Sequence, residues 1–250
     1  MLKATSRVSW QVRDHGGIGK LGTERALFRL TKQLPDLVWN AAALEGNTFT
    51  LPEVRTLLDG VTVGGKSLPE QQQILDLSEA FNLLADLVRT EQFDITAQVS
   101  NQLHQAVAGN EALDAGMFRG DGAVTGDGGG VRLTSGMHVP FDAAEQLHSD
   151  YQALLGSLHA LSDPVERALA YFCSATRSQF YFDGNKRTAR LVASGMLLSA
   201  GYSALNIPHA RRLEFNCALD QLFATDDATD LMAFLYDCLV ESSRESNGRL

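Results

Sequence analysis

Arg177-Ser-Gln-Phe-Tyr-Phe-Asp-Gly-Asn-Lys-Arg-Thr-Ala-Arg190 is the stretch around which the rest of the chain is organised. Apolar residues precede it, a turn of sequence Asp183-Gly184-Asn185 lies inside it, and an apolar run from Ala189 to Ala200 follows. Glycine tolerates any backbone angle, and Asn or Asp tolerates the left-handed one, so these three residues suit a tight loop. The stretch therefore predicts a loop that opens onto a helix.

The beginning of a helix can bind an anion, because its first N–H groups are free and the helix dipole is positive there. Lys186, Arg187 and Arg190 add cations at this point. Asp183 adds a carboxylate suited to Mg²⁺, which prefers one or two carboxylates together with substrate phosphates. The sequence therefore predicts a phosphate site; the alternative is a solvated helix start with two ordinary arginines.

Residues Phe182 to Arg190 also resemble the core motif of the Fic family. In that motif a His, three intervening residues, Asp or Glu, Gly, Asn, Gly, Arg, two further residues and Arg follow in order. This chain carries Gln179 at the position of the family His and Tyr181 at the position of its Phe. Lys186 replaces the usual Gly, as in the related death-on-curing toxins.

The resemblance extends over about residues 24–240 and implies an all-α fold, a Fic-type helical bundle with a small β-hairpin flap. Leu44-Glu45-Gly46-Asn47-Thr48 resembles the inhibitory-helix motif of the family, although Ala41 occupies its Ser/Thr position. Further family-like segments follow in family order: Val61–Ser67, Phe118-Arg119 and Asp163–Arg167.

In Fic enzymes, the His takes the proton from a target hydroxyl, which then attacks the α-phosphate of ATP. The resemblance implies that Asp183 holds Mg²⁺ and that Arg190 pairs with an autoinhibitory Glu45. It places the nucleotide phosphates on the loop and on the first helical turn: Gly184, Asn185, Lys186 and Arg187. These roles depend on electrostatic positioning, which is usually the larger part of phosphoryl-type catalysis.

Gln179 cannot replace the family His as a base, because a neutral amide has no proton that titrates near pH 7. Loss of a general base typically lowers the rate by about 10²–10⁴-fold. We therefore expect an ATP-binding protein whose AMP transfer is weak or lost. The remaining histidines are expected to be mostly ordinary surface or cap residues: His104, His138, His148, His159 and His209. The alternative is that His138 swings into the site from the flap.

Three alternatives remain open at this stage. An active nucleotidyl- or phosphotransferase would use an unconventional base, or Gln179 to orient the hydroxyl. A hydrolytic enzyme would use Glu45 to position water and remove AMP from a modified protein. A non-enzymatic interaction module would pair its flap with a partner by strand addition, and a protein target of an enzyme would also dock on the flap.

Composition narrows the class of partner. The 250 residues are 44% hydrophobic and 20% charged, as in a globular domain. A net charge of −9 without a dominant basic stretch argues against a nucleic-acid binder. No apolar run is long enough for a membrane span and no signal peptide opens the chain, so we expect a cytoplasmic protein. Cys173, Cys217 and Cys238 are expected to be small core residues in a reducing compartment, not a metal site or a set of disulfides.

Along the chain, we expect an arm (1–22), N-terminal helices that include the inhibitory-type helix (23–110), the Fic core (111–240) and a flexible tail (241–250). The first helix is expected to begin at Thr23 and to kink or break at Pro35. Two capping boxes and an Asp-Pro pair predict further helix starts: Thr50–Glu53, Ser67–Glu70 and Asp163-Pro164. The glycine-rich segment 116–140 is expected to contain the hairpin.

One competing motif needs an explanation. Gly60–Ser67 fits the phosphate-binding pattern of P-loop proteins, in which Gly-Lys-Ser opens a helix after a buried strand. Here the preceding segment 51–59 resembles a capped helix, and Pro69 follows at once. We therefore expect a connecting turn between two helices rather than a P-loop.

Overall fold

The computed structural model describes residues 1–13 and 17–245 and is helical over most of its length. The described part contains nine α-helices, two short 3-10 turns and two small antiparallel hairpins. The helices are α1 (Thr23–Leu44), α2 (Leu51–Leu58), α3 (Leu68–Arg89), α4 (Ala97–Ala108), α5 (Leu147–His159), α6 (Pro164–Ser178), α7 (Asn185–Ser199), α8 (Arg212–Thr225) and α9 (Thr229–Glu245). The predicted all-α class with a small hairpin flap is confirmed.

Local capping signals begin several of these helices as predicted. Thr50 starts α2 and Ser67 starts α3, each within a complete capping box. Asp163 starts α6, and its carboxylate accepts the backbone N–H of Glu166 at 2.8 Å. Each bond satisfies a donor that the first helical turn leaves free, which is why a three-residue pattern is enough to locate these ends.

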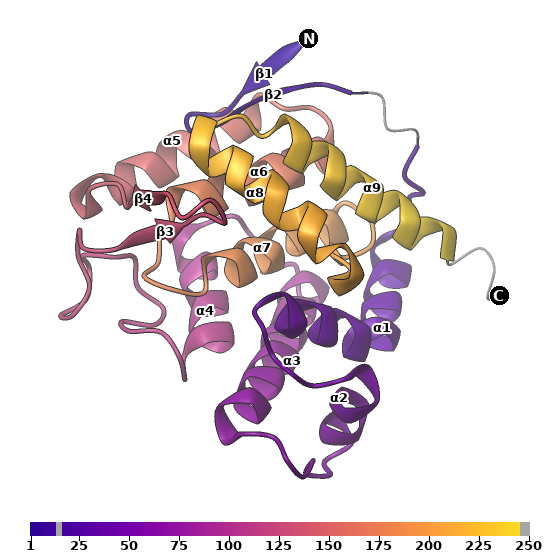
Figure 1. Cartoon of the computed structure of the whole chain (residues 1–250). Helices are drawn as coiled ribbons and strands as arrows, with labels where there is room; N and C mark the ends of the chain where they lie inside the picture. The colour runs from indigo at the N-terminus through magenta and orange to yellow at the C-terminus, as the bar shows by residue number, and fades with distance from the viewer. Residues whose placement is uncertain (14–16, 246–250) are drawn as a thin grey trace.

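Helix α7 lies in the middle of the fold, between α1, α2 and α3 on one side and α5, α6, α8 and α9 on the other (Figure 1). It packs most closely against α6. Twelve of its fifteen residues are buried, including Arg187, Thr188 and Arg190. The motif therefore begins the central helix of the molecule, and the alternative of a solvated helix start is wrong.

The hairpin expected within 116–140 is present. Strands β3 (Gly130–Arg132) and β4 (His138–Pro140) pair antiparallel, with Val131 opposite Val139. The tip of this flap is attached to α8, because the Asp220 carboxylate accepts the backbone N–H of Thr134 at 3.0 Å.

Three boundary predictions need correction. Residues 1–22 are more than an arm, because β1 (Leu2–Ala4) and β2 (Ser9–Gln11) form a second hairpin. Val8 and Trp10 of this hairpin are buried. Residues 14–16 of the predicted arm lie outside the described residues. Helix α1 runs through Pro35 without a break. The carbonyl that Pro35 leaves without an N–H partner belongs to Thr31, which is exposed and so accessible to water.

The third correction concerns the predicted flexible tail. Helix α9 continues to Glu245, so the first five residues of the segment 241–250 are helical. The remaining tail residues, 246–250, lie outside the described residues.

Within the described part of the chain, no helix is both long and apolar enough to cross a bilayer.

Candidate active site

A pocket of about 370 Å³ lies where the motif loop, the flap, α8 and the end of α1 meet. Its lining includes Gln179, the loop and helix start at 183–187, and Glu45 from the end of α1. Strand β3 and helix α8 supply the opposite walls. The structure thus brings together the predicted site residues, with the exception of Arg190, which does not line the pocket.

The carbonyl groups of the motif loop are held by donors from within the protein. Arg119 donates to two of them. Its Nε lies 2.8 Å from the Gln179 oxygen, and its backbone N lies 2.9 Å from the Phe180 oxygen. The Asn185 side-chain amide donates to the Tyr181 oxygen at 2.7 Å. His104 Nε2 lies 2.9 Å from the Asp183 oxygen.

The backbone N–H groups at the start of α7 show the opposite behaviour. The N-cap is Gly184, whose left-handed backbone (φ 73°) begins the helix without a side-chain cap. The N–H groups of residues 185–187 have no hydrogen-bond acceptor within the described residues. Because residues 183–187 line the pocket, these free amides and the positive end of the α7 dipole face a space in which an anion could bind.

Gln179 is fixed at both ends of its side-chain amide. Its Nε2 donates to the Thr176 oxygen at 2.6 Å, and its Oε1 accepts Asn185 Nδ2 at 3.1 Å. Its backbone is left-handed, at φ 50° and ψ 57°, where a residue other than Gly is strained. The side chain at the family's His position is therefore an amide whose polar atoms are already engaged.

Asn185 is placed by the fold as a brace of the loop. Besides its bonds to Gln179 and the Tyr181 oxygen, its Oδ1 accepts the Tyr181 N–H at 2.9 Å. The predicted contribution of Asn185 to a phosphate site therefore falls to its free backbone N–H.

Asp183 presents a carboxylate at the pocket, and its side chain is 64% exposed. One carboxylate oxygen accepts the Gly184 N–H at 2.6 Å, and Arg187 Nη2 lies 3.9 Å from the same oxygen. No group of three or more His, Cys, Asp or Glu side chains that could hold a metal occurs within the described residues. A single accessible carboxylate beside an anion site fits Mg²⁺ that is shared with ligand phosphates.

Lys186, and not Arg190, pairs with Glu45. The Lys186 Nζ lies 3.0 Å from Glu45 Oε2, in a pair whose side chains are 33% and 19% exposed. The expected Arg190–Glu45 ion pair is absent from the described residues, so this prediction is wrong. Lys186 reaches the carboxylate because its long cationic side chain extends into the space beside the loop.

Arg190 is buried and incompletely partnered. Its Nε and Nη2 atoms, like Glu45 Oε1, have no hydrogen-bond partner within the described residues. Burial lowers the pKa of Arg190 to about 10, and the nearby Glu45 charge partly opposes this shift. The guanidinium stays charged at neutral pH and contributes positive potential near the pocket residues Glu45 and Arg187.

Arg187 is anchored on α4 and on the segment that follows it. Its side chain is 4% exposed, and Nη1 lies 2.8 Å from Glu111 Oε2. Glu111 is a partner that the sequence analysis did not identify. Its position one turn after α4 carries no local signal, because the ion pair joins residues 76 positions apart.

His104 was expected to be an ordinary surface or cap residue, and this is wrong. Its ring is fully buried and is stacked on Tyr181 with the ring centroids 3.8 Å apart. Burial lowers the pKa of His104 to about 4, and the hydrogen bond to the Asp183 backbone partly opposes this shift. The available signal was its place on the apolar face of α4 beside Leu103 and Val107.

Arg119 joins the motif loop to the segments on either side of the flap. Besides Gln179, its guanidinium donates to the oxygens of Gly126 and Asp142, each at 3.0 Å. It also stacks 4.4 Å from the Phe141 ring centroid. The family-like Phe118-Arg119 pair thus sets the distance between flap and loop, a role that its sequence did not predict.

Comparison with known proteins finds a family model and several relatives that match this chain. Residues 94–197 match the model of the Fic/DOC family. The chain is 29% identical over 207 residues to the protein adenylyltransferase Fic of Drosophila yakuba, and 28% identical over the same length to that of Drosophila melanogaster. The match covers 80% of this chain and 39% of each of these relatives, so the chain spans about two fifths of their length.

Solved structures show the same fold. Fic-1 from C. elegans has a TM-score of 0.74 at 23% identity, over 90% of this chain and 66% of that chain. A Fic-domain-containing signaling protein from Bacteroides thetaiotaomicron has a TM-score of 0.74 at 20% identity, over 88% of both chains. Residues 94–197, which contain the motif loop, therefore match a Fic/DOC family domain, and the chain has the fold of these Fic structures.

Proposed function

We propose that this protein binds an ATP-like nucleotide with Mg²⁺ in the pocket and that its transfer of AMP to protein is weak or lost. One observation carries this proposal. The backbone N–H groups of residues 185–187 are free and face a pocket that Gln179 also lines. The amides and Arg187 would hold the phosphates, while Asp183 would hold Mg²⁺. The metal would neutralise phosphate charge when bound.

The reduced transfer activity follows from the chemistry of Gln179. An amide cannot accept the proton of a target hydroxyl, and both polar atoms of this amide are hydrogen-bonded inside the protein. The other groups around it still supply positioning and electrostatic stabilisation, which are worth a large part of the rate in phosphoryl-type reactions. The site is therefore one substitution away from having its general base.

The test is to restore that base. We expect Gln179→His, made alone and together with Glu45→Gly, to transfer labelled AMP from ATP to itself or to proteins of a lysate. The transfer rate should exceed that of the unmodified chain by about 10²–10⁴-fold. Gln179→Asn keeps an amide and is the matched control. Binding of ATP·Mg²⁺ without AMP transfer in both His variants would contradict the assignment of Gln179 to the base position.

Nucleotide binding is tested separately by calorimetric titration with ATP in the presence and absence of Mg²⁺. We expect binding in the unmodified chain and weaker binding for Arg187→Gln. Absence of binding at millimolar ATP, both in the unmodified chain and in Glu45→Gly, would refute the proposed function.

Removal of AMP from a modified protein is a second candidate, favoured by one observation. Glu45 lines the same pocket, and its Oε1 is buried without a hydrogen-bond partner within the described residues. Such an oxygen can orient a water molecule. Release of AMP from a modified substrate protein that stops in Glu45→Gln would support this candidate over the first.

A further inference from the structure

We propose that His104 is a positioning residue of the anion site: it fixes the peptide between Asp183 and Gly184, and so the direction in which the Asp183 carboxylate and the α7 amides face the pocket. The ligand consequence of this proposal rests on the function proposed above. The effect on the loop does not, because it concerns contacts within the protein.

The hydrogen bonds of the His104 ring define which of its nitrogen atoms carries the proton. The Gly116 backbone N–H donates to His104 Nδ1 at 2.8 Å, so Nδ1 must be the unprotonated nitrogen. The proton of the neutral ring is therefore on Nε2, which lies 2.9 Å from the Asp183 oxygen. One backbone contact thus sets the tautomer that makes the other contact possible.

Gly184 lies close to side chains of α4, including His104. A Cβ atom at this position would lie 2.9 Å from the Ala108 Cβ and 3.2 Å from His104 Nε2. The turn is therefore seated directly against α4, with the imidazole as part of the seat. Stacking on Tyr181 holds the ring plane, since the two rings are inclined by only 6°.

The Asp183 carbonyl has a different partner from the neighbouring carbonyls of the loop. Arg119 holds the oxygens of Gln179 and Phe180, and Asn185 holds that of Tyr181. The Asp183 oxygen is held by His104, which comes from a different helix. Without that bond, the peptide that precedes the N-cap of α7 would lose its anchor to α4.

A matched pair of substitutions separates positioning from stability. His104→Gln places an amide N–H near Nε2 and keeps the bond to Asp183 while losing the acceptor for Gly116. His104→Asn places an oxygen near Nδ1 and keeps the acceptor while losing the bond to Asp183. Each variant loses one hydrogen bond, so a purely structural role predicts similar thermal midpoints and similar loop behaviour for both.

The primary measurement is amide hydrogen exchange of the ligand-free protein at residues 188–190, the first hydrogen-bonded amides of α7. We expect about tenfold faster exchange there in His104→Asn, the factor that corresponds to one net hydrogen bond, and little change in His104→Gln. Equal exchange in the two variants would overturn the proposal, whatever their thermal midpoints. This measurement needs no nucleotide and remains decisive if the proposed function fails.

The second measurement is the affinity for ATP·Mg²⁺, well below the unfolding temperature of each variant. We expect affinity about tenfold weaker for His104→Asn and within about threefold of the unmodified chain for His104→Gln. Loop exchange that responds as expected, combined with no nucleotide binding by the unmodified chain, would refute the proposed function while the positioning role stands. Unequal exchange with equal affinities would overturn the ligand consequence of the proposal.

Discussion

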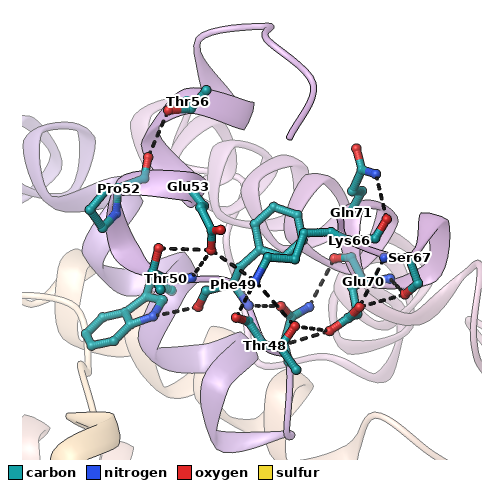
Figure 2. Close-up of polar contacts among 12 residues, drawn as sticks. Thr48, Phe49, Thr50, Pro52, Glu53, Thr56, Lys66, Ser67, Glu70 and Gln71 are labelled. Carbon is teal, nitrogen blue, oxygen red and sulfur yellow. Dashed lines mark hydrogen bonds and ion pairs between the residues drawn. The ribbon is translucent and has the colours of Figure 1, made fainter. Parts of the chain in front are cut away.

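Two loops of this protein contain a glycine turn followed by a lysine at the start of a helix, but only one leaves free helix N–H groups at a pocket. In the loop at 60–67, Ser67 and Glu70 cap α3 reciprocally, and Pro69 removes one further donor. Lys66 is occupied as well, because its Nζ lies 3.0 Å from Glu53 Oε2 and 2.6 Å from the Thr48 oxygen. Figure 2 shows this closed network between α2 and α3.

The motif loop leaves the corresponding groups free. Gly184 has no side chain with which to cap α7, and the amides of residues 185–187 open into the pocket. The comparison shows that a glycine-lysine pattern before a helix does not make a phosphate site by itself. A site results when the first helical N–H groups have no side-chain acceptor. The expected connecting turn at 60–67 is therefore confirmed, and a P-loop there is excluded by the helix that precedes it.

The largest expected difference between the two loops concerns their glycines. Gly184 and Gly65 are both left-handed, at φ 73° and 78°, but only Gly184 is enclosed, since nothing lies within 4 Å of a Cβ at Gly65. We expect Gly65→Ala to lower the free energy of unfolding by about 1–2 kcal/mol, the cost of the left-handed conformation. Gly184→Ala should cost about 1–3 kcal/mol more, because of the contact with Ala108. Denaturant unfolding measures both, and equal losses would show that Gly184 is not enclosed.

Acid should affect the two loops in different ranges of pH. The His104 pKa is lowered to about 4, so the unfolded chain binds the additional proton first as the pH falls below 6.5. We expect the free energy of unfolding to decrease between pH 6.5 and pH 4, by an amount on the order of 3 kcal/mol, and then to level off for this group. The decrease should be absent in His104→Gln, and a decrease of the same size in that variant would contradict the assignment.

The corner at 60–67 should resist acid over most of that range. Hydrogen bonds from Thr48 and Ser67 lower the pKa of the Glu70 carboxyl to about 2. Its stabilising contribution is present above pH 4.5 and is lost as the pH falls through about 2. Amide exchange at pH 5, corrected for its intrinsic rate, should therefore loosen the motif loop before the corner.

The two lysines should differ in their effect on nucleotide affinity. Lys186→Met leaves the Glu45 charge uncompensated beside the pocket, so we expect affinity for ATP·Mg²⁺ to fall about tenfold, or 1.4 kcal/mol. Lys66→Met should leave the affinity unchanged and lower the free energy of unfolding by no more than about 1 kcal/mol, as for a surface ion pair. Calorimetric titration of both variants provides the comparison. Equal affinities would show that the Lys186–Glu45 pair does not influence the pocket.

The smallest expected effect is that of the helix cap at the corner. Ser67→Ala removes the acceptor for the Glu70 N–H and should lower the free energy of unfolding by about 1 kcal/mol. Affinity for ATP·Mg²⁺ should not change, because α3 begins outside the pocket. A measurable change in affinity would indicate that the corner transmits to Glu45 through the turn at Asn47 and Thr48.

The sequence by itself determined the class of fold, the starts of α2, α3 and α6, and the motif loop that faces the pocket. These features depend on contacts between residues three or four positions apart, such as Ser67 with Glu70, so a short pattern contains all the participants. That Gln179 is an amide, which cannot act as a base, is likewise visible in the sequence.

Only the tertiary structure decided which groups those residues meet. It pairs Glu45 with Lys186 instead of Arg190, buries His104 against Asp183, and folds the first residues into a hairpin. The partners of these contacts are distant in sequence, and several cations compete for each carboxylate. Their choice is set by side-chain length and by the packing of α1 and α4 against α7, which no local pattern records.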